Sequence, residues 1–155
     1  MTQAPKQSSQ ADQPDQPAPP ALSQSAALQP PGWPRPKGYS NGVLAPRGRS
    51  IFVAGMIGWD AAGHFASPRL ADQARVALAN VVAVLAAAGA TPEHIARMTW
   101  YVTSKREYLA QGREIGAAFR ELIGNYRIAM STVEVTALME DAAKVEIEVT
   151  AVLPD

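Results

Sequence analysis

The fold is decided by residues 70–104, which read "LADQARVALANVVAVLAAAGATPEHIARMTWYVTS". The first half carries apolar side chains at helical spacing, followed by a glycine stop at Gly89. The repeating positions are Leu70, Ala74, Leu78, Val81, Val82 and Leu85. From residue 95 onward the residues are large and mostly β-favouring, which is typical of a strand. The stretch therefore predicts an amphipathic helix followed by a strand.

The segments on either side complete the predicted order of elements. Upstream, "GVLAPRGRSIFVAGMIGW" (residues 42–59) predicts two short strands around a turn at Pro46 to Gly48. Downstream, residues 105–123 have the pattern of a second amphipathic helix. Two more strands follow, "IAMSTVEVTAL" (residues 128–138) and "KVEIEVTAVL" (residues 144–153). The order β-β-α-β-α-β-β predicts an α+β fold with the helices on one face of the sheet.

Alternation along the last two strands predicts what each sheet face carries. In the final strand Val145, Ile147 and Val149 point one way, and Glu146 and Glu148 point the other way. In the strand before it, one row mixes apolar, hydroxyl and carboxylate side chains, which is unusual for a core face. We expect the face away from the helices to carry Glu146, Glu148, Met130, Thr132 and Trp100. A face of that mixture suggests a surface covered by another subunit.

Composition excludes several classes of function. The 155 residues have a formal net charge of zero, so no electrostatic footprint for nucleic acid or an anionic membrane is visible. The absence of cysteine removes disulfides and thiolate chemistry, and it fits a reducing compartment, so we expect a cytoplasmic location. No apolar run approaches the roughly 18 residues of a membrane span. The two histidines, His64 and His94, give no metal-ligand spacing.

The N-terminal segment differs in composition from the rest. Residues 1–36 are rich in Gln, Pro, Ser and Ala and hold nine of the chain's 13 prolines. Such a segment buries too little apolar surface to offset its ordering entropy. We therefore expect a disordered tail over residues 1–36 and one folded domain over residues 37–155.

Residues 37–155 resemble the RidA (YjgF/L-PSP) family. The resemblance is carried by "GYSNGV", "IFVAGMIGWD", the stretch 70–104 and "MSTVEVTALMEDAAKVEIEVTAV", in that order and spacing. It implies a chorismate-mutase-like fold and a homotrimer in which three sheets form a central barrel. Ligand clefts would lie between neighbouring subunits. Active family members hydrolyse reactive imines or enamines to a 2-keto acid and ammonia, and they need no metal or cofactor.

Some residues match the chemistry of that family. Tyr39 matches a cleft-lining tyrosine, and Glu146 matches a glutamate that positions or activates the attacking water, with Glu148 as its companion. A carboxylate at the edge of such a cleft can accept a proton from water and return it to the leaving ammonia. Thr132 lies in the same polar and apolar row as Met130 and is a further candidate for substrate binding.

Other positions depart from the family pattern. Met130 stands where the family has the arginine that holds the substrate carboxylate, so the chain resembles a divergent member. Ala54 and Met56 replace a serine and a glutamine of the substrate site, and Gly112 aligns with a frequent asparagine. Arg127 would point to the other face of an ideal strand; a bulge before Met130 would turn it inward, and a solvated arginine is the alternative.

Three functions of different class remain open. The first is hydrolysis of an imine or enamine with an altered substrate range, with Glu146 and Tyr39 as catalytic residues. The second is a non-catalytic trimer that binds an apolar small molecule or a protein partner in the same cleft. The third, a ribonuclease or translation inhibitor, is disfavoured by the neutral charge and by the lack of a cluster of His, Lys and Arg.

Overall fold

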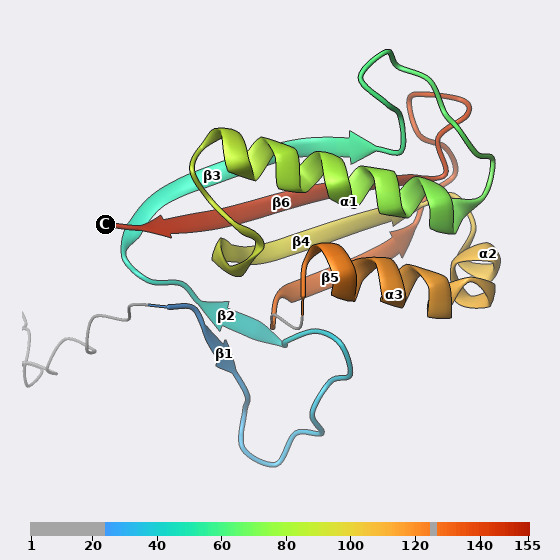
Figure 1. The fold of residues 1–155 in the computed structure, drawn as a ribbon. Helices are drawn as coiled ribbons and strands as arrows, with labels where there is room; N and C mark the ends of the chain where they lie inside the picture. Colours follow the sequence, from blue (N-terminus) through green and yellow to red (C-terminus); the bar gives the residue numbers. More distant parts are fainter. Residues whose placement is uncertain (1–23, 125–126) are drawn as a thin grey trace, which may run out of the picture.

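The computed structural model describes residues 24–124 and 127–155 (Figure 1). Its strands are β1 (Ala26–Leu28), β2 (Gly42–Leu44), β3 (Gly48–Ile57), β4 (Ile95–Val102), β5 (Ala129–Glu134) and β6 (Val145–Pro154). Its helices are α1 (Leu70–Ala87), α2 (Lys105–Ala110) and α3 (Gly112–Leu122), with a 3-10 turn at Pro92–His94.

The main sheet has four strands in the order β3-β6-β4-β5. β6 runs antiparallel to both of its neighbours, and β5 runs parallel to β4 at the edge. α1 and α3 lie side by side over one face of this sheet (Figure 1). We call the opposite face the open face. The α+β fold class and the placement of the helices on one face are confirmed.

The core lies between α1 and the sheet. Leu70, Leu78, Val81 and Leu85 of α1 are fully buried, and they pack in one cluster with the buried side chains of β4 and β6. By length and composition alone α1 could cross a membrane. Its apolar side instead faces the sheet, which is the ordinary arrangement of a core helix.

The buried Gln73 connects α1 to two loops. Its amide nitrogen donates to the carbonyl oxygens of Ser67 and Ala142, at 3.0 and 2.9 Å. Its amide oxygen accepts from the backbone N–H of Lys144 at 2.8 Å. A buried amide is stable only when its polar atoms are paired, and here both are. The loop before α1 and the loop before β6 are thereby held beside the same helix.

The helix predicted over residues 105–123 is two helices, α2 and α3, with a break at Gln111. Ser104 caps α2 by accepting from the N–H of Glu107 at 3.1 Å. The side-chain oxygen of Gln111 accepts from the N–H of Ala71, one of the unpaired donors at the start of α1, at 2.7 Å. A tertiary contact with another helix thus stabilises the break, and the periodicity of residues 105–123 alone does not reveal it.

A short strand lies inside the segment expected to be a disordered tail. β1 pairs antiparallel with β2, with Ala26 opposite Leu44 and Leu28 opposite Gly42. This part of the expectation is wrong, because the backbone of Ala26–Leu28 finds a hydrogen-bonding partner that composition does not predict. Residues 1–23 lie outside the described residues, and the domain boundary at residue 37 stays a prediction.

The expected distribution of side chains over the two sheet faces is wrong for β5. In the parallel register Met130 lies beside Met98 and Thr132 beside Trp100. Trp100 in turn lies beside Ile147, on the helix side of the sheet, whereas Glu146 lies beside Tyr101 on the open face. Neighbours in register share a face, so Met130 and Thr132 are on the helix side. The expected face also included Trp100, which is fully buried under the helices.

Candidate functional site

A cavity of about 990 Å³ opens at the edge of the sheet beside β5. We call it the edge pocket. Side chains of β4, β5, α2 and α3 form its inner wall, namely Trp100, Tyr108, Ile115, Phe119, Met130 and Thr132. The outer wall comes from residues 27–29 and 35–40, the segments around the β1–β2 pair. The edge position of β5 leaves this side of the molecule open to a ligand.

Two glycines of α3 help to make the cavity. Gly112 and Gly116 lie one turn apart on the side of the helix that lines the pocket. A Cβ atom added at Gly112 would meet no other atom within 4 Å. The pocket is therefore wide at Gly112, since no side chain extends from the helix there.

The floor of the edge pocket is aromatic. The Trp100 and Tyr108 rings meet edge to face, with centroids 6.2 Å apart and planes at 74°. Within the described residues the buried indole N–H of Trp100 has no hydrogen-bond partner. Trp100 itself is fully buried, so of this pair the partly buried Tyr108 ring presents the apolar surface to the pocket.

Four of the eight predicted site residues line the edge pocket: Tyr39, Arg127, Met130 and Thr132. The N–H of Ser40 donates to the carbonyl oxygen of Ile128 at 2.8 Å, and Ser40 bridges to Ala129. This pairing fixes the segment that carries Tyr39 against the start of β5. The Tyr39 ring is 45% exposed, so its hydroxyl is accessible to a ligand.

The other four predicted residues lie elsewhere in the chain. Glu146 is on the open face, where its carboxylate lies over the backbone of Gly55. Ala54 is exposed beside that glycine, in the irregular register between Val53 and Met56. Met56 packs against the core. Within one chain, the two predicted catalytic residues, Tyr39 and Glu146, are therefore separated by the sheet.

Glu148, the last of the eight, also lies on the open face. The hydroxyl of Tyr101 donates to its carboxylate at 2.7 Å. This hydrogen bond, with a smaller effect of burial, raises the pKa of the Tyr101 hydroxyl above its ordinary value. Tyr101 and Glu148 together form a polar, hydrogen-bonded patch in the middle of the open face.

Sequence reasoning missed three cations that line the edge pocket. Arg35 and Lys37 lie in or beside the expected tail, and Arg120 has the pattern of a helix-surface charge. The sequence signal that could have revealed Arg120 is a regular spacing: Gly112, Gly116 and Arg120 follow one another at intervals of four residues. It places Arg120 on the side of α3 from which the two glycines have removed the side chains.

The structure offers no cluster for a metal ion in the part of the chain it describes. Across residues 24–124 and 127–155, no three His, Asp or Glu side chains gather at a distance suited to one cation. The polar groups that line the edge pocket are hydroxyls, amides and cations, and these groups suit an organic anion better than a metal.

Comparison with known proteins places the chain in the class of the Rid and YjgF proteins. The family model described as Endoribonuclease L-PSP matches residues 34–153, so the chain belongs to this family. A RutC family protein of Pyrococcus horikoshii is 31% identical over 120 residues, which cover 76% of this chain and 90% of the relative.

Solved structures agree with this assignment. YyfB, a Rid family protein of Yersinia pestis, is 30% identical with a TM-score of 0.74, covering 84% of this chain and 99% of that chain. A YjgF/YER057c/UK114 family member of Mycobacterium tuberculosis is 34% identical with a TM-score of 0.56. The match covers 75% of this chain and 87% of that chain. Escherichia coli TdcF with bound serine is 30% identical with a TM-score of 0.58. The match covers 83% of this chain and 98% of that chain.

Proposed function

We propose that the chain acts as a cytoplasmic homotrimer that hydrolyses reactive imines or enamines without a cofactor. Water adds to the carbon of the C=N bond, the C–N bond breaks, and the products are a carbonyl compound and ammonia. The observation that carries the proposal is the edge pocket, in which Tyr39, Arg127, Met130 and Thr132 come together. A relative of the same fold, TdcF, has serine bound, which supports a ligand derived from an amino acid.

The proposed cleft needs a second copy of the chain. Glu146 lies on the open face, and the edge pocket lies on the helix side, so one chain cannot bring Glu146 to a ligand beside Met130. In a ring of identical subunits, the face of one copy can meet the edge of the next. We therefore assign Glu146 to the cleft of the neighbouring subunit.

The roles of the two catalytic residues follow from their chemistry. The Glu146 carboxylate accepts a proton from the attacking water and returns it to the departing amine as ammonia forms. The Tyr39 hydroxyl can donate a hydrogen bond to a substrate oxygen or nitrogen at the mouth of the pocket. Neither step requires an electron acceptor, because hydrolysis is redox-neutral.

Met130 favours a second candidate function. A thioether cannot replace the bidentate contact of an arginine with a carboxylate. If this loss removed catalysis, the same pocket would serve a non-catalytic trimer that binds an apolar small molecule or a protein partner. The two functions differ in whether an imine is consumed faster with the protein than without it.

The test generates imines in situ with an amino-acid oxidase, from a panel that includes alanine, leucine, methionine and phenylalanine. We expect keto-acid release above the spontaneous rate for at least the bulky members of the panel. Glu146→Gln and Tyr39→Phe should each abolish most of that gain. A wild-type trimer that accelerates none of the panel would overturn the hydrolase and leave the binding function.

Mixed trimers test whether Glu146 acts in its neighbour's cleft. Co-expression of Glu146→Gln chains with Tyr39→Phe chains should rebuild about a quarter of the clefts with both residues intact, since each cleft takes one residue from each of two randomly assorted chains. The expected rate is well above that of either variant alone. If the mixture is no more active than the variants, the two residues act from the same chain, and the assignment in trans is wrong.

A further inference from the structure

Four cationic side chains line the edge pocket: Arg35, Lys37, Arg120 and Arg127. Among the described residues that line it there is no Asp or Glu. None of these four cations forms an ion pair in the part of the chain that the structure describes. The pocket thus carries a local excess of positive charge in a chain whose net charge is zero. A concave site with one sign of charge concentrates ligands of the opposite sign.

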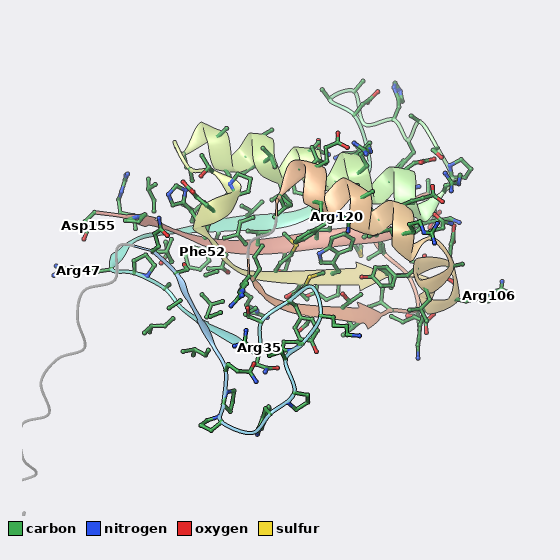
Figure 2. The ribbon with its side chains drawn as sticks, turned by 60° about the horizontal axis from the view of Figure 1, so that its bottom comes forward. Arg35, Arg47, Phe52, Arg106, Arg120 and Asp155 are labelled. Carbon is green, nitrogen blue, oxygen red and sulfur yellow. The ribbon has the colours of Figure 1, made fainter. Side chains whose placement is uncertain are left out.

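The cations come from different parts of the chain. Figure 2 labels Arg120 on α3 and Arg35 on the segment between β1 and β2. Lys37 follows on that same segment, and Arg127 lies before β5. Charges of like sign repel one another when they are gathered without counter-charge. An anion bound in the pocket would be attracted by each of the four side chains.

Arg120 is the cation most clearly aligned with the cavity. Its Nη1 atom lies 3.3 Å from the position that a Cβ atom on Gly116 would occupy. The guanidinium therefore lies back along α3, over the glycine that lines the pocket, as side chains on a helix tilt toward its N-terminus. By contrast Arg69, just before α1, and Arg75 of α1 are each paired with a carboxylate of α3, Glu114 and Glu121 respectively.

The rest of the pocket is apolar and large. The partly buried side chains of Tyr108, Phe119 and Met130 offer ring and thioether surface on its inner wall. A cavity of about 990 Å³ is far larger than a three- or four-carbon acid needs. The thioether of Met130 is flexible and apolar, so it adapts to an apolar group where an arginine would require a charge.

We propose that the edge pocket binds monocarboxylates with a bulky apolar group, such as aromatic or long aliphatic 2-keto or 2-imino acids. The apolar group lies against Tyr108, Phe119 and Met130, and the carboxylate pairs with Arg120 in the field of the other three cations. The substrate class rests on the proposed function, while the binding itself does not require turnover. The anchor has thus moved from strand β5 to helix α3.

The test is calorimetric titration of the full-length protein with 3-phenylpropionate, its neutral amide and propionate. We expect 3-phenylpropionate to bind at least about tenfold more tightly than either of the others, because the amide lacks the charge and propionate lacks the ring. Higher salt should weaken the binding of the acid and leave that of the amide unchanged. Equal affinity for the acid and the amide, or tighter binding of a nucleoside monophosphate, would overturn the proposal.

A matched pair of variants tests Arg120. Arg113 is an exposed arginine of the same helix that does not line the pocket. Arg120→Gln should weaken 3-phenylpropionate binding about tenfold or more, whereas Arg113→Gln should leave it unchanged. Gly116→Ala keeps every charge but displaces the guanidinium, so it should give a smaller loss in the same direction. Equal effects of the two arginine variants would remove Arg120 from the site.

The failure of the proposed ligand class can be distinguished from the failure of the proposed hydrolase activity. If the acid binds as expected and no imine is hydrolysed, the hydrolase is wrong and the ligand class stands. If small imines are hydrolysed and 3-phenylpropionate does not bind, the ligand class is wrong and the hydrolase stands.

Discussion

Two residues carry the departure of this chain from the active members that it resembles. Met130, which the resemblance aligns with the family's arginine, lines the edge pocket beside Thr132. Arg120 brings a guanidinium into the same pocket from α3. An anchoring charge on helix α3 instead of strand β5 changes where in the pocket the carboxylate of a ligand is held. Small acids that need a charge on β5 should therefore be poor substrates.

At the residue scale, Met130→Arg should restore activity toward small imines. We expect keto-acid release from iminopropionate to rise about ten- to a thousandfold, the range that corresponds to roughly 1.4 to 4 kcal/mol of regained transition-state stabilisation. The matched control is Met139→Arg, which adds the same charge at a side chain that is 95% exposed and does not line the pocket. Rapid turnover of iminopropionate by the wild type would show that another group already holds the small carboxylate.

At the scale of elements, α2 is held by one partly buried ion pair. The Lys144 ammonium, just before β6, donates to both carboxylate oxygens of Glu107, at 3.0 and 2.8 Å. The same carboxylate accepts from the N–H of Leu70 at 3.3 Å. Lys144 is the largest influence that lowers the pKa of Glu107 below its ordinary value. One side chain thus joins α1, α2 and the start of β6.

This ion pair makes stability depend on pH in a defined direction. A carboxyl whose pKa is lowered by folding contributes stability above its unfolded value of 4.5, and that stability is lost as the pH falls through the folded pKa. We expect the free energy of unfolding of the wild type to exceed that of Glu107→Gln by about 1 to 3 kcal/mol at pH 7. We expect this difference to shrink below pH 4.5. Urea unfolding at a fixed protomer concentration measures it. In a Lys144→Met background the same substitution should show much less dependence on pH; an unchanged dependence would assign the effect to another group.

At the scale of the whole molecule, the open face is unusual for an exposed surface. Phe52 of β3 is 79% exposed and Val133 of β5 is 44% exposed, beside the polar patch of Tyr101 and Glu148. An aromatic side chain exposed on the face of a sheet favours burial against another chain. A domain of this size also gains stability when a second sheet face is covered. The proposed homotrimer would bury this face.

Phe52→Asp should therefore dissociate the proposed trimer. A carboxylate buried at a subunit interface without a partner is costly, so we expect a shift from trimer to monomer at micromolar concentration in sedimentation equilibrium. The matched control is Leu109→Asp, at an α2 side chain that is 65% exposed and lies away from the open face. A wild type that sediments as a monomer would contradict the trimer itself, and a Phe52→Asp trimer would place the interface elsewhere.

The sequence by itself determined the α+β fold class, the helix α1 and the alternation of β6. These features depend on the spacing of apolar side chains along the chain, which is a local property. Tyr39, Met130, Thr132 and Arg127 were also identified as site candidates from the sequence, and the structure places all four at one pocket.

The tertiary structure decided which face each β5 side chain occupies, where the second helix breaks, and which cations surround the pocket. The row of Met130 and Thr132 mixes apolar and polar groups, so alternation alone does not orient it; the parallel register with β4 does. Gln111 ends α2 by bonding to the first turn of α1, 40 residues away. Arg35 and Arg120 are brought to one cavity by chain segments far apart in sequence, because the β1–β2 pair and α3 lie at the same edge of the sheet.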